Sequence, residues 1–219
     1  MILISPQTAE NLYWMGRYIQ RAETMTRLVI QSFDKILDID PDEGTRLYAK
    51  MGVELIYKTP QEFLQKSIFG LEYASLIYTI DNARENAIVT RSHLPNRMFS
   101  RINALYLKYQ NAKETLPVSI FWLESTLQEL DAIWGNLELS LVEAKEIPFI
   151  EFGRITERMD LNIRLYNSME AALFDLEKLN FLGYKLTPHY KKLSLSSSNT
   201  EKTLKKINGL YYGTVITAS

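Results

Sequence analysis

The sequence predicts an all-α protein: a bundle of about seven helices, in which long antiparallel helices contain an internal duplication. Three observations support this fold class. Glycine and proline are few, at 9 and 7 of 219 residues, and the prolines separate stretches whose apolar residues recur every three or four positions. The motif Gly-Arg-x3-Arg also occurs twice, at Gly16 and at Gly153. We expect one helical domain over residues 1–183 and a peripheral, partly flexible segment over 184–219.

The first half of the chain contains five predicted helices. They cover residues 6–38, 42–57, a short stretch from Pro60 to Gly70, 75–93 and 96–113. Ser5 can cap the first of them, and Pro6 suits its first turn. Thr59 and Glu62 have the spacing of a capping box at the start of the third. The fourth is expected to stop before Pro95, because the residue before a proline disfavours helical conformation.

Two longer helices are predicted next, over residues 117–144 and 148–181. Pro117 and Pro148 can each occupy a first helical turn, and apolar residues then recur at helical spacing. Gly183 is expected to end the second of these helices.

The segment 184–219 differs in composition from the rest. Residues 194–200 contain little apolar side chain, which indicates a solvated, mobile stretch. Residues 210–217 are β-prone, and we expect irregular structure or packing against a helix, because the chain has no other strand signal. The lysines of this segment could contact phosphate, although a basic tail is commonly only solvated: Lys191, Lys192, Lys202, Lys205 and Lys206.

Composition and charge limit the function classes. Lysine and arginine number 25 against 26 aspartates and glutamates, so the net charge of −1 gives no bulk field that attracts nucleic acid or an anionic membrane. The absence of cysteine excludes disulfides, thiolate nucleophiles and cysteine-ligated zinc. No stretch approaches the ~20 apolar residues of a membrane span, and the start of the chain lacks the features of a signal peptide. We expect a cytoplasmic protein without a nucleic-acid or membrane partner; its oligomeric state is not predicted.

Each copy of the repeated motif places two arginines on one side of a long helix. Arg17 and Arg21 are one helical turn apart, as are Arg154 and Arg158, with Glu157 beside the second pair. These arginines lie opposite the main apolar stripe, yet flanking aromatic and leucine residues indicate that protein covers this side as well. Two arginines at this spacing repel each other, so each pair needs carboxylates from elsewhere or an anionic ligand.

Two further features accompany both copies. Gly16 and Gly153 each cost about 1 kcal/mol relative to alanine inside a helix, which predicts that another helix or a ligand approaches closely there. Each copy also has an acid four residues before an arginine, a spacing that favours ion pairs: Glu23 with Arg27, and Asp160 with Arg164.

Three interpretations of these charged residues follow from the sequence. In the first, an Arg/Glu network only fixes the register of the bundle in a structural assembly subunit. In the second, the guanidinium groups bind an anionic or peptide ligand, because their planar fork suits a carboxylate or phosphate. In the third, Glu157 is the general base of an enzyme, although neighbouring arginines would lower its pKa.

A third block carries a family resemblance. Ala83-Arg84-Glu85-Asn86-Ala87, with Arg91 beyond it, lies between the runs at 12–18 (Leu-Tyr-Trp-Met-Gly-Arg-Tyr) and 152–158 (Phe-Gly-Arg-Ile-Thr-Glu-Arg). In this order the three blocks resemble the bacterial alpha-E domain family, an all-helical domain named for its Glu-Arg motif. We predict a central polar cluster that binds an anionic or peptide ligand, with these candidates: Arg17, Arg21, Arg84, Arg91, Arg154, Glu157 and Arg158.

The resemblance also implies a partner. Such domains are typically encoded beside, or fused to, a circularly permuted ATP-grasp protein, and often a transglutaminase-like peptidase. This implies a non-catalytic accessory or binding protein of a peptide-forming or peptide-modifying system. The chain looks like a shortened, divergent member. Family members commonly continue with further helices after the second arginine motif. Gln20 stands where the family's first copy usually has Glu, and Arg97 and Phe99 stand where the family has an acid and a tryptophan ahead of the asparagine, here Asn103.

Motifs of independent catalysis are missing from the sequence. His93 and His189 belong to no Glu-x-x-His pair, which a di-metal helical bundle requires. There is no glycine-rich phosphate loop, no nucleophile elbow and no cysteine or histidine placed for a triad. We therefore expect no catalytic residue, no metal and no cofactor.

Overall fold

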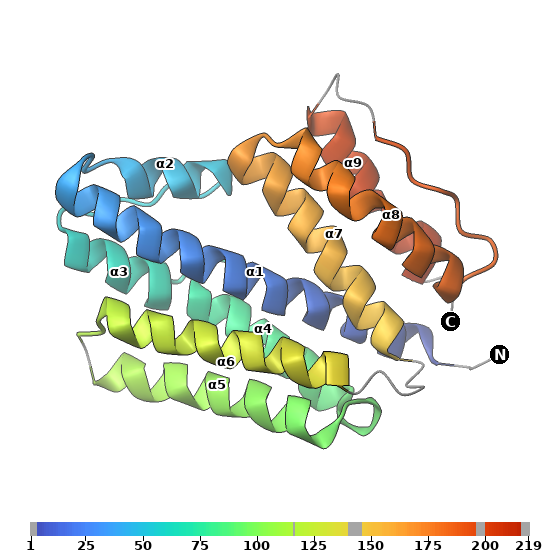
Figure 1. Cartoon of the computed structure of the whole chain (residues 1–219). Helices are drawn as coiled ribbons and strands as arrows, with labels where there is room; N and C mark the ends of the chain where they lie inside the picture. Colours follow the sequence, from blue (N-terminus) through green and yellow to red (C-terminus); the bar gives the residue numbers. More distant parts are fainter. Residues whose placement is uncertain (1–3, 116, 140–145, 196–199, 216–219) are drawn as a thin grey trace.

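The structure, a computed structural model, describes residues 4–115, 117–139, 146–195 and 200–215. These residues form nine α-helices and no strand, which confirms the all-α fold class with more helices than the seven expected (Figure 1). The helices are α1 Pro6–Asp38, α2 Glu43–Lys50, α3 Pro60–Phe69, α4 Leu76–Val89, α5 Asn96–Glu114, α6 Ile120–Leu139, α7 Ile147–Tyr166, α8 Met169–Leu186 and α9 Thr200–Leu210.

Local capping signals predicted the starts of α1 and α3, whereas α6 begins at Ile120 and not at Pro117 as expected. Ser5 Oγ accepts a hydrogen bond of 3.1 Å from the Thr8 amide at the start of α1, which has the predicted bounds. At the start of α3, Thr59 Oγ1 accepts from the Glu62 amide at 3.1 Å, and the Glu62 carboxylate accepts from the Lys58 amide at 2.8 Å. The reciprocal bonding expected of the capping box is therefore present, shifted by one residue on the carboxylate side.

Two predicted helices are shorter than expected. The helix over 42–57 ends at Lys50, because Gly52 takes a φ of 78°, in the left-handed region. Val53 and Leu55 are buried and alternate with exposed neighbours, which is the pattern of extended backbone. The helix over 75–93 ends at Val89, and a single 3₁₀ turn, Arg91–His93, leads to Pro95.

The predicted long helix over 148–181 is wrong, because the chain breaks into α7 and α8. Asn167 adopts the left-handed conformation with a φ of 49° and ends α7. Ser168 then caps α8 through a 3.2 Å hydrogen bond from the Ala171 amide to its hydroxyl oxygen. Gly183 does not end α8; it lies against the ring of Tyr190 while the helix continues to Leu186.

The described part of the C-terminal segment contains helix that the sequence did not indicate. Helix α9 packs on α7 and buries Ile207 completely. A π-helical turn, Tyr211–Val215, follows it, and the Tyr211 ring stacks on that of Tyr13 at 5.4 Å between centroids. The segment predicted to be peripheral therefore contributes to the core. Other sequence predictions concern residues outside the described ranges: the chain start at 1–3, the end of the helix to 144, the stretch 196–199 and the run beyond 215.

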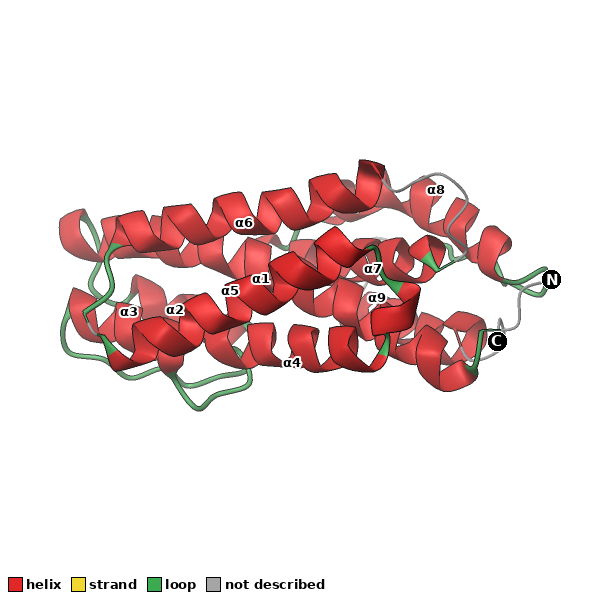
Figure 2. Cartoon of the chain, turned by 90° about the horizontal axis from the view of Figure 1, so that it is seen from below, coloured by secondary structure: helices red, strands yellow, loops and turns green. Residues whose placement is uncertain are grey.

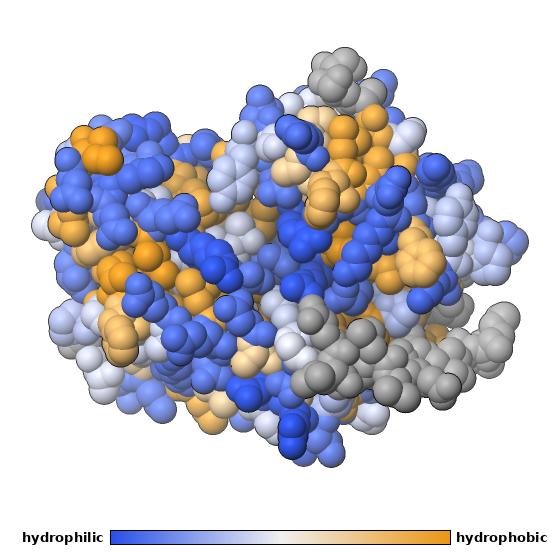
Figure 3. All heavy atoms as spheres, in the orientation of Figure 1, coloured by the Kyte–Doolittle hydropathy of each residue, from blue (hydrophilic) through white to orange (hydrophobic). Residues whose placement is uncertain are grey.

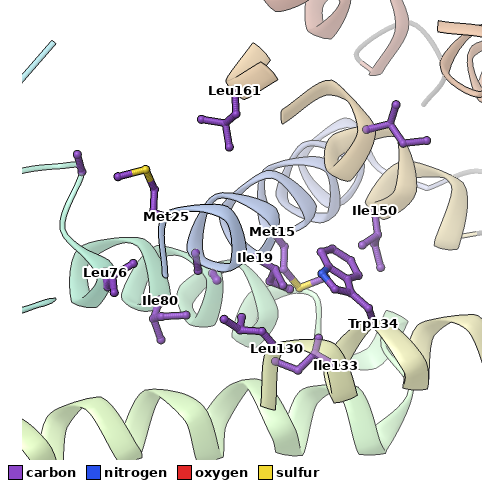
Figure 4. Packing of buried hydrophobic residues seen from close by; sticks show 14 of the residues in the cluster. Met15, Ile19, Met25, Leu76, Ile80, Leu130, Ile133, Trp134, Ile150 and Leu161 are labelled. Carbon is purple, nitrogen blue, oxygen red and sulfur yellow. The ribbon is translucent and has the colours of Figure 1, made fainter. Parts of the chain in front are cut away.

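Helix α1 is the central element of the bundle. It packs against α7, α4, α6, α2 and α3, while α5 packs against α4 and α6. Figure 1 shows α3 to α6 on one side of α1 and α7 to α9 on the other, and Figure 2 shows the helices from below. In Figure 4, Met15 and Ile19 of α1 point toward Ile133 and Trp134 of α6. The apolar stripe predicted for the first helix therefore faces the core.

The surface is mixed in character. Figure 3 shows hydrophobic residues interrupted by hydrophilic ones over the visible face. Among the described residues, no helix combines the length and apolar character needed to cross a membrane.

Candidate functional site

The two glycines of the repeated motif lie where α1 and α7 cross. A Cβ added to Gly16 would collide with the carbonyl oxygen of Ile150, and one added to Gly153 would collide with that of Tyr13. The prediction of a close approach at these glycines is confirmed, and the approaching group is the other helix. The contacts are reciprocal, since each glycine meets the residue three positions before the other. These two contacts belong to one crossing of two helices and do not test whether the chain is internally duplicated. The internal duplication therefore stays a prediction.

Glu157 connects the two arginines of α1. Arg17 Nε donates to one carboxylate oxygen and Arg21 Nε to the other, each at 2.6 Å. The Glu157 side chain has no exposed surface, and the Arg17 side chain is 5% exposed. Burial raises the pKa of Glu157, but the charges and hydrogen bonds of both arginines outweigh it and lower the pKa to about 2. The carboxylate that the arginine pair required therefore comes from α7.

A second group of bonds extends this cluster to α9. Arg17 Nη1 donates to Asn208 Oδ1 at 2.9 Å, and Asn208 Nδ2 donates to Asp160 Oδ1 at 2.8 Å. Asp160 also accepts from Arg164 Nε at 2.6 Å, so the ion pair predicted from their spacing is present. The ring of Trp14 lies 5.1 Å from the Arg17 guanidinium carbon. Helix α9 thus holds Arg17 and Asp160 in place through one amide side chain.

A cavity of about 240 Å³, named here the arginine pocket, opens beside this cluster. Its lining residues are Trp14, Arg17, Arg21, Met51, Tyr73, Asp160, Arg164 and Asn208.

The arginine pocket carries an excess of positive charge. Three guanidinium groups meet two carboxylates, Glu157 and Asp160, so one positive charge is unmatched among the described residues. Arg21 illustrates this excess: its Nε bonds Glu157, while its two terminal nitrogens have no hydrogen-bond acceptor among the described residues. Its side chain is 18% exposed. The arginine pocket therefore offers guanidinium N–H groups to an anion.

Arg154 lies on the other side of the crossing. Its Nε donates to Gln20 Oε1 at 3.3 Å, the counterpart of the bond from Arg17 to Glu157 with the helices exchanged. Its Nη1 donates to Glu151 at 3.3 Å, and its guanidinium carbon lies 4.1 Å from the Trp134 ring centroid. Arg154 is thus held by protein groups and does not line the arginine pocket.

The remaining predicted site residues lie apart from the arginine pocket. Arg158 forms a two-pronged ion pair with Asp175 of α8, with Nε to Oδ2 at 2.6 Å and the second bond from Nη2 to Oδ1. Arg84 Nε donates to Asn103 at 3.0 Å. Arg91 packs over the Phe99 ring at 4.7 Å from its centroid.

The single central cluster predicted from the sequence is thus divided in the structure. Arg17, Arg21 and Glu157 meet at one place, whereas Arg84 and Arg91 face α5, whose Asn103 and Phe99 hold them.

Two pocket residues had no sequence signal. Asn208 lies in the segment 184–219, which was predicted to be peripheral, and Tyr73 lies between α3 and α4, where its hydroxyl donates to the Met51 carbonyl oxygen. Both reach the arginine pocket through contacts between residues far apart in the chain, which periodicity does not reveal. The described residues contain no group of three histidine, cysteine, aspartate or glutamate side chains that could hold a metal ion.

Comparison with known proteins gives one family. Residues 4–197 match the sequence model of Alpha-E, a predicted alpha-helical domain with a conserved ER motif. Glu157-Arg158 is the chain's only Glu-Arg dipeptide. No curated protein and no solved structure matches the chain.

Proposed function

We propose that this chain, which belongs to the alpha-E family, is a non-catalytic accessory protein that binds a carboxylate-bearing ligand in the arginine pocket. The observation that supports the proposal is the charge balance of that pocket. Arg17 and Arg21 share a single carboxylate, and Arg21 lines the cavity while its terminal nitrogens have no acceptor among the described residues. A bound anion would supply the missing negative charge and accept hydrogen bonds from these nitrogens.

The pocket favours a small monoanion. One unmatched positive charge suits a carboxylate better than a phosphate, which carries nearly two negative charges at neutral pH. The volume of about 240 Å³ lies below that of typical sites for whole drug-sized ligands, so it suits a chain terminus or an acidic side chain. The aromatic residues Trp14 and Tyr73 line the same cavity and can pack against the attached chain. The substrate class that we propose is therefore a peptide with a free carboxylate.

A specific observation favours a structural alternative. Glu157 is fully buried and accepts from both arginines at 2.6 Å, so it can fix the register of α1 against α7 without a ligand. In that case the chain would be an assembly subunit and its charged cluster purely architectural. The two hypotheses differ in the role of Arg21. In the structural alternative, only the bond from its Nε to Glu157 matters, whereas in the binding hypothesis its terminal nitrogens also donate to the ligand.

The lowered pKa of Glu157 counts against the enzyme alternative. A general base works best with a pKa near the working pH, whereas that of Glu157 is lowered to about 2. Both of its oxygens are also occupied by guanidinium groups.

A peptide with a free carboxyl terminus, and the same peptide with an amidated terminus, test the proposal directly. Binding of acetyl-Ala-Ala-Ala in both forms can be measured by isothermal titration calorimetry. We expect the free acid to bind at least ~10-fold more tightly than the amide, because a hydrogen bond to a charged group contributes about 1.5–3 kcal/mol. Arg21→Gln should remove this preference. Arg101→Gln is the matched control, since it removes the same charge from a surface pair with Glu129.

Two results would contradict ligand binding in the arginine pocket. One is equal affinity for the acid and the amide; the other is the absence of binding at millimolar peptide. If Arg21→Gln then lowers the stability while no peptide binds, the structural alternative is the better description.

We also propose an ATP-grasp-type protein as partner, on the basis of the family resemblance. A pull-down with this chain from its native organism tests the association. Recovery of an ATP-grasp enzyme would support it, whereas reproducible recovery of this chain alone would count against it.

A further inference from the structure

A second cavity lies at the C-terminal end of the described chain and is basic. It has a volume of about 640 Å³, within the range of small-molecule sites, and is formed by the coil after α8 together with α9 and the turn that follows. Lys191 and Lys192 line it from the coil, and Lys206 lines it from α9. No aspartate or glutamate is among its lining residues. This cavity, named here the lysine cavity, is distinct from the arginine pocket.

The coil that bears Lys191 and Lys192 is fixed to α8, unlike a solvated tail. Asn180 Oδ1 accepts from the Tyr190 hydroxyl at 2.9 Å and from the Leu193 amide at 2.8 Å, and Asn180 Nδ2 donates to the Leu193 carbonyl at 3.1 Å. Tyr190 and Leu193 are both buried. Figure 1 shows this coil running back past α8. Three side-chain hydrogen bonds therefore hold the two lysines in one place relative to α8.

The opposite wall is also anchored. Ile207, next to Lys206, is fully buried, and Lys206 Nζ donates to the Ser194 carbonyl at 3.3 Å, which connects the two walls. Gly209 and Gly213 lie in this wall, and a Cβ added to either would meet no atom within 4 Å. This wall thus combines a cation with two positions at which the helical backbone has open space beside it.

The three ammonium groups lack a protein counter-charge. Among the described residues, Lys191, Lys192 and Lys206 form no ion pair with a carboxylate. Lys205, the neighbour of Lys206, differs in this respect, since it pairs with Glu201 at 2.7 Å and does not line the cavity. Three like charges around one cavity repel one another, so a ligand with several negative charges would be attracted by all three.

We propose that the lysine cavity binds a phosphorylated small molecule of the nucleoside di- or triphosphate class. The three lysines match the several negative charges of a polyphosphate group. The apolar part of the wall, with Leu193, Leu210 and the open backbone of Gly209, offers a surface for a planar base. Lys206, Gly209 and Leu210 of this cavity lie beyond residue 197, where the family match ends. The inference does not depend on the arginine pocket.

Titration calorimetry with metal-free ADP, pyrophosphate and adenosine tests this site. We expect ADP to bind most tightly, pyrophosphate next and adenosine least. Changing Lys191, Lys192 and Lys206 together to glutamine should weaken ADP and pyrophosphate binding more than ~10-fold, because one exposed ion pair contributes up to about fivefold. The control Lys205→Gln removes the same charge next to the cavity and should leave the affinities within about twofold.

A steric variant keeps the test independent of charge. Gly209→Leu places a side chain in open space at the cavity and favours helix, so the fold should persist, which circular dichroism verifies. It should weaken ADP binding more than pyrophosphate binding, since it occupies the space assigned to the base. Arg21→Gln should not change either affinity, which separates this site from the proposed function.

Three outcomes would overturn the inference. They are equal loss of ADP binding in Lys205→Gln and in the triple variant, unchanged ADP binding in the triple variant, and no binding of ADP or pyrophosphate at millimolar concentration. The first would mean that diffuse surface charge, and no built site, attracts the anions.

Discussion

Replacing Gly153 by alanine tests the close crossing of α1 and α7, on which the whole charged cluster depends. The added Cβ would lie much closer than 3.0 Å to the Tyr13 carbonyl oxygen. Real Cβ atoms essentially never come closer than 3.0 Å to such an atom. The obstacle is backbone, so it cannot rotate away as a flexible side chain would. Gly16 meets the Ile150 carbonyl in the same way. The two helices must therefore separate to accept either alanine.

The loss of stability caused by Gly153→Ala has two sources: the separation of α1 from α7 and the lengthening of the hydrogen bonds between them. A gap of ~1 Å forfeits about a quarter to a half of the dispersion attraction of the contacting atoms. Overpacking of this kind costs about 1–3 kcal/mol in well-packed interiors. The 2.6 Å bond from Arg17 to Glu157 spans the same crossing and would lengthen as well. The weakened bond adds about 1 kcal/mol to this cost, whereas alanine in place of glycine favours helix by about 1 kcal/mol. We therefore expect Gly153→Ala to lower the free energy of unfolding by about 1–3 kcal/mol.

Equilibrium unfolding in urea, followed by circular dichroism, measures this change. With a slope of about 2–3 kcal/mol per molar urea, the midpoint should fall by about 1 M. Gly135→Ala is the matched control, because a Cβ at Gly135 of α6 meets no atom within 4 Å and should raise the stability by up to about 1 kcal/mol. The double variant of Gly16 and Gly153 should cost less than the two single changes added, since the first already separates the helices.

An equal effect of Gly153→Ala and Gly135→Ala on the free energy of unfolding would contradict a close approach of α1 and α7 at Gly153. The crossing would then have room for a side chain, and the close approach of the two backbones could not be what aligns Arg17 with Glu157.

Three further predictions concern the ion pairs. Glu157→Gln should lower the free energy of unfolding by about 3 kcal/mol, measured in urea, because it leaves two arginines without their shared carboxylate. Asp175→Asn should cost only about 1–2 kcal/mol in the same assay, since its partner Arg158 is 37% exposed; an equal cost would contradict the role of burial. Because the folded-state pKa of Glu157 is lowered from 4.5 to about 2, its contribution of about 3 kcal/mol should be complete above pH 4.5 and disappear as the pH falls toward 2. Comparing the pH dependence of unfolding in wild type and Glu157→Gln checks this, and parallel profiles would contradict it.

Helix starts could be predicted from the sequence because their signals are local. Ser5 and Thr59 cap the helices that they were expected to cap, through bonds to amides three residues away. The break at Asn167 was missed because apolar residues continue at helical spacing on both sides of it. The Asn-Ser pair does carry a signal, since asparagine tolerates the left-handed conformation and serine caps the next helix.

The candidate site was predictable only in part. The wheel positions of Arg17 and Arg21 indicated a covered, charged side opposite the main apolar stripe, and the structure confirms that covering. The source of the shared carboxylate depends on the crossing of α1 and α7, which no pattern within one helix specifies. The contribution of Asn208 depends on α9, a short helix whose stability comes from packing on α7 more than from its own sequence.

The neutral side chain of Gln20 has a physical explanation at the crossing of α1 and α7. Its position mirrors that of Glu157, but its neighbours differ: its amide nitrogen donates to Thr24 at 3.2 Å and lies 3.5 Å from a carboxylate oxygen of Glu23. A glutamate there would bring two carboxylates together in a buried place and lose both donated bonds. A glutamate at position 20 would place a negative charge beside Arg154, but Arg154 already forms an ion pair with Glu151. The neutral amide therefore suits this side of the crossing, while the other side keeps one carboxylate for two arginines, and the excess positive charge lies at the arginine pocket.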